Sequence, residues 1–347
     1  MKAYVFLIMI FLLVVGCDGG KIIYYQTQWN EFEDNVGSFH TIKIDGTDDK
    51  VIIEDLKIPK DAHVGPICPS PNGQQIVFAT YRHWGPDPET VIHVIDMDGT
   101  NQSELLRAER LSISIKCWSS EYNKILFTEY VGKDSAEIFI MDADGSNQEK
   151  ILAGNVGEAA WSTTGDKIIF HKRTTNFSNG NDKTGFYSVD RNGLNIRFIV
   201  EYWPSSGDDT CYPENFSKKG NRLLCSTRDW EGENALYFID FPGPRNDTDL
   251  SEGGALEISG SNGEPIGDTV FPKENTTGIW NKTLIAAFGD DWHACELWLE
   301  NEEKILGTYW DEDNNDNMYV INSDGTGKVG IKKGPHLSFA CNSAWVK

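Results

Sequence analysis

The feature that most constrains this chain is a short motif that recurs along its length. Each copy is a β-rich run closed by a tight turn, as in Glu137–Gly145. Asp, Asn and Gly tolerate the positive φ angles of such turns, so each copy predicts a strand followed by a hairpin. Four clear copies end at Gly99, Gly145, Gly193 and Gly325, and two looser copies end at Gly46 and Gly243. Self-similarity of this kind indicates a repeat architecture.

A second element precedes the copies. It has an aromatic residue or Pro, a polar turn, and then a polar residue with three mostly apolar ones. The stretch Trp161–Phe170 is the cleanest example, and other copies begin at Pro69, Trp118, Phe216 and Trp298. Together the two elements resemble the repeats of TolB-like β-propellers. The resemblance extends over nearly all of residues 21–347.

This resemblance implies an all-β fold, a six-bladed β-propeller of four-stranded antiparallel blades. The ring is expected to close by pairing of the N- and C-terminal strands. Lys21–Tyr24 matches Lys167–Phe170, whereas Trp345 stands where a further inner strand should begin. We therefore expect the last blade to combine residues 336–346 with strands from 21 to about 55, which would protect the sheet edges.

The interval between Gly243 and Trp298 is longer than the others but too short for another blade. We interpret it as an insertion within about 248–290, with a hairpin of its own such as Thr283–Phe288. Insertions in repeat arrays usually lie on one face and often carry function.

The N-terminus predicts export. Lys2 is followed by an apolar run, Ala3–Val15, that is too short to span a bilayer and fits the core of a signal peptide. Gly16 directly precedes Cys17, which resembles a bacterial lipobox. We expect residues 1–16 to be a lipoprotein signal peptide, Cys17 to carry a lipid, and residues 17–20 to form a short tether. The alternative is an ordinary signal peptide, with a secreted product.

Composition limits the partners. The formal charge is −22, which disfavours nucleic acid because the phosphate backbone requires Lys and Arg. The charge serves solubility or, alternatively, forms an acidic docking face. Apolar residues make up 39% of the chain, enough for a sizeable core. We expect a monomer.

Signatures of catalysis are sparse. The sequence contains no Gly-x-Ser-x-Gly elbow, phosphate loop or dinucleotide fingerprint. The Asp-x-Asp-Gly turns could hold calcium, but their repetition favours hairpin turns. A better calcium candidate is the acidic loop with the oxygen ligands Asp311, Asp313, Asn315 and Asp316, for which a solvated loop is the alternative. No cofactor is expected otherwise.

The tryptophans fall into two groups. Trp118, Trp161, Trp298 and Trp345 recur at one repeat position, which predicts packing between blades. Five others lie between repeats, where Trp often marks a recognition surface or else packs beneath loops. As a hypothesis, these five line one rim of the ring: Trp84, Trp203, Trp230, Trp292 and Trp310.

Six cysteines remain beyond Cys17, and an even number in an exported chain permits disulfides. Position in the repeat suggests three pairs. They are Cys68 with Cys117, Cys211 with Cys225, and Cys295 with Cys341.

Two functions follow from these observations. The first is a non-enzymatic envelope lipoprotein, anchored in a bacterial membrane, whose propeller binds a protein or glycan partner. The alternative is a channel-centred enzyme, such as a metal-assisted polysaccharide lyase or hydrolase. The seven His residues show no regular spacing on equivalent strands, which favours the first function.

Overall fold

The computed structural model describes the chain in segments whose secondary structure consists of strands and turns. The described residues are 21–28, 35–59, 62–82, 88–109, 113–119, 122–132, 135–154, 156–162, 165–172, 185–201, 210–216, 222–228, 234–240, 282–289, 293–299, 304–310, 316–334 and 337–339. Within these segments, no helix is long and apolar enough to cross a membrane.

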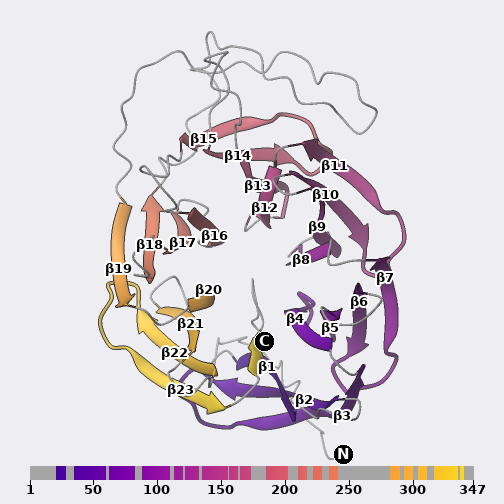
Figure 1. Cartoon of the computed structure of the whole chain (residues 1–347), viewed down its shortest axis with the longest axis vertical. Coiled ribbons are helices and arrows are strands. Elements are labelled where there is room, and N and C mark those ends of the chain that lie inside the picture. Colours follow the sequence, from indigo (N-terminus) through magenta and orange to yellow (C-terminus); the bar gives the residue numbers. More distant parts are fainter. Residues whose placement is uncertain are drawn as a thin grey trace, which may run out of the picture.

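Four sheets contain four antiparallel strands each (Figure 1). The closing sheet has the order β24 (Leu337–Phe339), β1 (Lys21–Gln28), β2 (Asn35–Lys43) and β3 (Lys50–Ile58). The next has β4 (Ala62–Pro69), β5 (Gln75–Arg82), β6 (Glu89–Asp96) and β7 (Ser103–Glu109). The third has β16 (Thr210–Phe216), β17 (Arg222–Arg228), β18 (Asn234–Asp240) and β19 (Lys282–Gly289). The fourth has β20 (His293–Leu299), β21 (Lys304–Trp310), β22 (Asp316–Asn322) and β23 (Val329–Gly334).

The remaining sheet is eight-stranded and consists of two antiparallel halves. One half has β8 (Ile113–Trp118), β9 (Lys124–Gly132), β10 (Ser135–Asp142) and β11 (Glu149–Gly154). The other has β12 (Val156–Trp161), β13 (Lys167–Lys172), β14 (Gly185–Asp190) and β15 (Arg197–Glu201). They join where Ala136 pairs with Val156. The all-β antiparallel architecture is confirmed, whereas the count of six blades stays a prediction because residues 241–281 lie outside the described residues.

The ring closes as expected. β1 pairs with β24 through Tyr24 with Phe339, Tyr25 with Ser338, and Gln26 with Leu337. The closing sheet therefore contains strands from both ends of the chain. Trp345, which was expected to begin the inner strand, lies outside the described residues.

One detail of the expected insertion is wrong. Residues Thr283–Phe288 do not form a separate hairpin but lie in β19, which pairs with β18 as the outer strand of its sheet. The apolar run of this segment is explained by this position within a sheet. The boundaries 248–290 otherwise stay a prediction, since residues 241–281 lie outside the described part.

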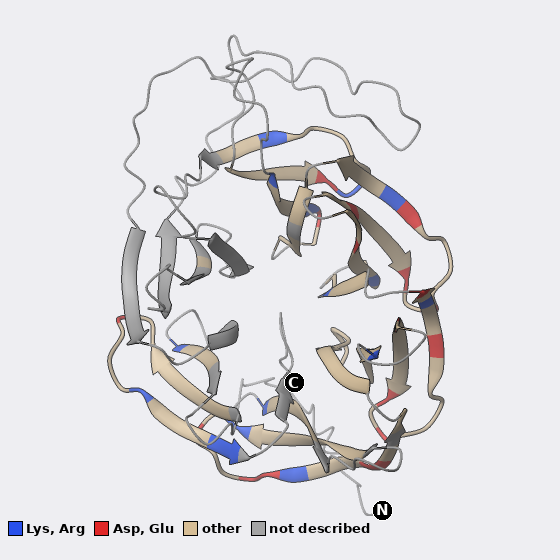
Figure 2. Ribbon diagram, viewed as in Figure 1, with Lys and Arg blue, Asp and Glu red and all other residues tan. Residues whose placement is uncertain are grey.

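The core consists of apolar layers between neighbouring sheets. One cluster joins the closing sheet to both of its neighbours through residues such as Phe39, Phe78 and Met318. Where such layers cover both faces of a sheet, second strands such as β5 are nearly continuous apolar runs, with Ile76–Ala79 at most 1% exposed. Trp118 and Trp161 are buried in such layers, as their repeat position predicted. Charged residues gather on outer strands and turns (Figure 2).

The repeated turn glycine is where neighbouring sheets meet. Gly145 has a φ of 82°, a value that favours glycine, and an added Cβ would lie 2.8 Å from the carbonyl oxygen of Leu105 in β7 of the preceding sheet. The same contact recurs at Gly46 with Ile331 and at Gly193 with Ile151. The turn thus requires glycine both for its backbone angle and for close approach.

A polar cluster locks the closing sheet to β23. Asp49 accepts hydrogen bonds from Lys332 Nζ at 2.6 Å and from Tyr24 Oη at 2.7 Å. Burial raises the pKa of Asp49, but the hydrogen bonds from Lys332 and Tyr24 outweigh burial and lower that pKa overall. His40 stacks on Tyr24, and burial lowers the pKa of His40. We call Tyr24, His40, Asp49 and Lys332 the closing cluster.

We predict that Gly145→Ala lowers the free energy of unfolding by about 2 kcal/mol, because alanine is strained at this φ and meets the Leu105 carbonyl. Gly330→Ala is the matched control, since its added Cβ has no neighbour within 4 Å. Urea unfolding measures both. Equal stability of the two variants would contradict the role of the turn.

We predict that Asp49→Asn lowers the free energy of unfolding at pH 7 by about 1 kcal/mol, because the amide leaves Lys332 without its partner charge. The folded pKa of Asp49 is lowered, so its contribution is fully present above the unfolded value of about 3.9. It is lost as pH falls through the folded pKa. Wild type and variant should therefore converge in stability below about pH 4.

The neighbouring Asp48→Asn is the control for this titration. Asp48 pairs with Lys50, whose side chain is 61% exposed, and with Lys21, and Asn tolerates its φ of 56°. It should leave unfolding nearly unchanged. A stability difference for Asp49→Asn that stays constant down to the lowest pH would refute the lock.

Candidate functional site

Two kinds of turn lie on the same face of the ring, as in the sheet β4–β7. One turn joins its first and second strands, and the other joins its third and fourth strands. Because antiparallel strands alternate in direction, both turns end up at one edge of the sheet. We call this side the turn face.

The turns between third and fourth strands are stabilised from within. In Asp96–Thr100, the Gly99 N–H donates to the Asp96 carbonyl at 2.9 Å, and Asp98 Oδ1 accepts from the Thr100 N–H and hydroxyl at 2.9 and 2.6 Å. The hydroxyl bond, followed by the backbone bond, lowers the pKa of Asp98. The same pair of bonds recurs at Asp45, Asp144 and Asp324.

The carboxylate of the first Asp in these turns also accepts hydrogen bonds from neighbouring side chains. Asp96 accepts from Gln75 Nε2 at 2.9 Å and from Asn101 Nδ2 at 2.7 Å. Asp142 and Asp190 repeat this arrangement with a Lys and an Asn each. The carboxylates serve the hairpins, so the interpretation of these motifs as turns is confirmed.

A hollow of about 340 Å³ opens on the turn face, between the two halves of the eight-stranded sheet. Its lining combines two cations, two carboxylates, a phenol and an amide. The residues are Tyr122, Asp166, Lys167, Asp190, Arg191 and Asn192. Tyr122 comes from the turn before β9, whereas the other five come from turns of the neighbouring half.

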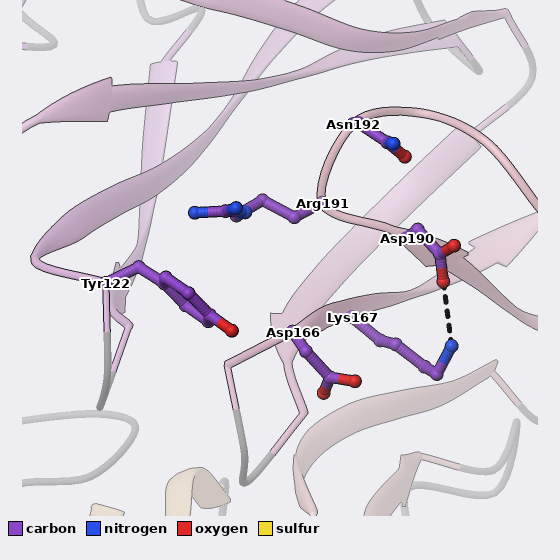
Figure 3. A pocket seen from close by; sticks show the side chains of 6 residues that line it. All are labelled: Tyr122, Asp166, Lys167, Asp190, Arg191 and Asn192. Atoms are coloured by element: carbon purple, nitrogen blue, oxygen red, sulfur yellow. Dashed lines mark hydrogen bonds and ion pairs between the residues drawn. The ribbon is translucent and has the colours of Figure 1, made fainter.

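Arg191 and Tyr122 form the contact across this junction. The Arg191 guanidinium carbon lies 4.0 Å from the centre of the Tyr122 ring, and the Arg191 side chain extends toward that ring and away from Asp190 (Figure 3). Lys167 Nζ donates to Asp190 Oδ1 at 2.7 Å, and Asn195 occupies the other oxygen. Burial raises the pKa of Asp190, but the hydrogen bonds from Asn195 and Lys167 lower it overall.

Tyr122 departs from the repeat. In the equivalent turns, Ser70–Gln75 and Ser162–Lys167, the fourth residue is glycine with positive φ. In the turn Ser119–Lys124 this place is taken by Tyr122, and the positive φ moves to Asn123. The ring of Tyr122 is 39% exposed. The turn therefore forms without glycine and presents an aromatic side chain.

Arg191 departs from the repeat as well. Its backbone N–H donates to the Asp166 carbonyl, as the Met97 N–H donates to Gln74, so the two turns match. However, Met97 packs on the apolar layer, and so does Ala143 at the same position of its own turn. Sequence reasoning missed this site, although aligning the repeats would have marked both Tyr122 and Arg191 as exceptions.

The predicted tryptophan rim is not tested. Trp84, Trp203, Trp230 and Trp292 lie outside the described residues. Trp310 ends β21, where it pairs with Asp316 at the edge opposite the turn face, and its side chain is outside the described set. The rim hypothesis stays a prediction for that opposite face.

The acidic loop joins β21 to β22. Trp310 and Asp316 are paired on the two strands, so the loop is the connection of a hairpin. Asp311, Asp313 and Asn315 lie outside the described residues, and the calcium site stays a prediction. In the described part of the chain, no three His, Cys, Asp or Glu side chains gather to hold a metal ion.

The disulfide pairs also stay predictions. Cys68 is buried in β4, and Cys117 lies in β8, which contacts β4. Cys225 pairs with Pro213 and Cys211 with Thr227, so these two cysteines are diagonal neighbours, which usually lie slightly too far apart for a disulfide. Cys295 lies in β20, and Cys341 is outside the described residues.

The innermost strands share an irregularity that sequence reasoning also missed. Five of them have a shifted register in mid-strand, which adds residues at a level between the two ends of each strand. The bulged positions are Gly65 and Pro66 in β4, Lys116 in β8, Gly157 and Glu158 in β12, Glu214 in β16, and Cys295 and Glu296 in β20. Bulges are common beside functional sites, so this level is where a channel-centred chemistry would act.

Histidines in the described residues are spread over four sheets, and only His63 and His93 share one. His93 in β6 stacks on Phe78 and contacts Thr80 Oγ1 at 2.9 Å, and burial lowers the pKa of His93 to about 4. His40 Nε2 lies 2.7 Å from Ser38 Oγ, and its Nδ1 lies 3.5 Å from Asp49 Oδ1. This order of contacts resembles a Ser-His-Asp triad, but Asp49 is shared within the closing cluster, to which we assign it.

Comparison with known proteins supports the architecture. No protein-family model matches the sequence, and no curated protein matches it. Among solved structures, TolB from Acinetobacter baumannii superposes with a TM-score of 0.60 at 13% identity, covering 92% of this chain and 66% of the TolB chain. This chain thus spans slightly less than two thirds of that protein.

Two further solved structures cover most of this chain at lower TM-scores. A chain in a nidogen–laminin complex superposes with a TM-score of 0.51 at 10% identity, covering 93% of this chain and 98% of that chain. The β-propeller domain of the Trilobed protease from Pyrococcus furiosus gives 0.48 at 13% identity, with 91% and 96% covered. The chain has a β-propeller fold, and that fold is TolB-like.

Proposed function

We propose that this protein is a non-enzymatic binding scaffold of the bacterial cell envelope, whose turn face recognises a protein or glycan partner. The hollow at Tyr122 and Arg191 is the observation that carries the proposal. Aromatic residues and arginine dominate the binding energy of recognition surfaces. Here both project from turns whose backbones are fixed by hydrogen bonds.

The chemistry of the described residues supports binding over catalysis. The carboxylates of the turns are taken up by hydrogen bonds within those turns. Asp49 and His40 belong to the closing cluster. The channel-centred enzyme stays the alternative, and its place would be the bulged level of the inner strands.

The envelope location rests on the N-terminal sequence and on the likeness to TolB. We propose that residues 1–16 are removed and that a lipid on Cys17 anchors the ring through the tether 17–20. The likeness to a chain in a nidogen–laminin complex is compatible with a protein partner.

We predict that Cys17→Ser moves the protein from the membrane fraction to the soluble fraction of its host, because the thiol that would carry the lipid is lost. The measurement is fractionation with immunoblotting. Cys68→Ser is the control and should stay with membranes. Membrane retention of Cys17→Ser would contradict the lipid anchor.

We predict that a photo-crosslinking amino acid at position 122 captures a specific envelope partner in living cells. The matched control is position 130, since Tyr122 and Tyr130 are 39% and 37% exposed, and Tyr122 precedes β9 whereas Tyr130 lies near its far end. Capture should be specific to position 122 and reduced by unlabelled protein. Capture at 130 alone would move recognition to the opposite face.

A further inference from the structure

We infer that the hollow at Tyr122 and Arg191 is a subsite for a sugar acid, with the Arg191 guanidinium receiving its carboxylate. The inference deepens the proposed function, on which it rests, by naming the ligand class. It is carried by an arginine with unused donors, by the two departures from the repeat, and by the charge balance of the lining.

The guanidinium of Arg191 is uncommitted. Within the described residues its side chain lies over the Tyr122 ring and forms no ion pair. Arg107 contacts Glu104 and Glu89, and Arg82 contacts Glu89. In a chain with 53 acidic and 31 basic residues, an arginine without an acidic partner keeps its donors for a ligand.

The stacking contact leaves those donors usable. The N–H groups of a guanidinium lie in its plane and form a fork that matches the two oxygens of a carboxylate. The Tyr122 ring occupies one face of Arg191, so it restrains the side chain without consuming the fork. A lysine could not reproduce this geometry, because its ammonium is a point charge.

Neither residue is needed to build the ring. Equivalent turns form with glycine in place of Tyr122 and with Met97 or Ala143 in place of Arg191. Those two apolar residues pack on the layers between sheets. Two exceptions that meet at 4.0 Å across a junction therefore mark a site added to the scaffold.

The lining favours a hydroxylated monoanion. Lys167 and Arg191 balance Asp166 and Asp190, so the hollow accepts one carboxylate more readily than a dianion such as phosphate. Sugar hydroxyls need acceptors, and the carboxylate of Asp166 lines the same space (Figure 3). The Asn192 amide group can donate, because its oxygen already accepts from Leu194. A volume of about 340 Å³ admits one sugar ring.

The test is titration of the full ring with D-glucuronate, followed by calorimetry or by NMR of the Arg191 side chain. D-glucose, acetate and an amidated acetyl-aspartate are the comparison probes. Glucuronate should bind, and Arg191→Met should weaken it at least about tenfold, as expected for a lost bidentate contact. Arg191→Lys should recover only part of the affinity. Arg82→Lys, on the opposite face, should leave it unchanged.

Several results would overturn the inference. They are no saturable binding of glucuronate, equal binding of glucose, tighter binding of acetyl-aspartate, or wild-type affinity in Arg191→Met. Urea unfolding of Arg191→Met should match wild type, which separates a lost ligand contact from a lost packing contact. Capture of a partner at position 122 without glucuronate binding would contradict this inference but would still support the proposed function.

Discussion

β1 and β24 pair through Tyr24 with Phe339 and two further residue pairs, which places strands from both ends of the chain in one sheet. With that sheet in place, one apolar cluster continues from it into both neighbouring sheets. Asp49 and Lys332 add a charged contact at the same junction. A second strand such as β5 can be almost wholly apolar because apolar layers cover both faces of its sheet.

The turns connect this packing to function. Four third–fourth turns place their glycine against the outer strand of the preceding sheet or half-sheet, namely those of Gly46, Gly99, Gly145 and Gly193. Their carboxylates are held by neighbouring hydroxyls and amides. The backbones of these turns are therefore held in place by hydrogen bonds, and some turn positions can carry different side chains without a change of fold. Tyr122 and Arg191 use this freedom. The turn of Arg191 keeps the backbone bond that the Met97 turn has, and the turn of Tyr122 keeps the bond from the Ser119 N–H to the Lys124 carbonyl. The proposed recognition residues thus occupy turn positions at which the fold does not require a particular side chain.

Much of the fold could be predicted from residues close together in the sequence. The turns at Gly99 and Gly145 and the apolar run at Ile168–Phe170 follow from local preferences for φ and for burial. Closure could be anticipated because Lys21–Tyr24 repeats the pattern of a second strand. The role of Thr283–Phe288 could not be predicted, because a short apolar run fits a hairpin as well as an outer strand. Only its pairing with β18 identifies it as an outer strand.

The sequence by itself determined an antiparallel propeller with turn glycines, closed by its two ends, because these features depend on repeating local patterns. The tertiary structure alone decided that Tyr122 and Arg191 meet, since they belong to different repeats and no local pattern links them. It also decided that the paired carboxylates of the turns serve hydrogen bonds, and that five inner strands are bulged in mid-strand. Contacts between repeats depend on how sheets stack around the ring, which is a property of the whole chain.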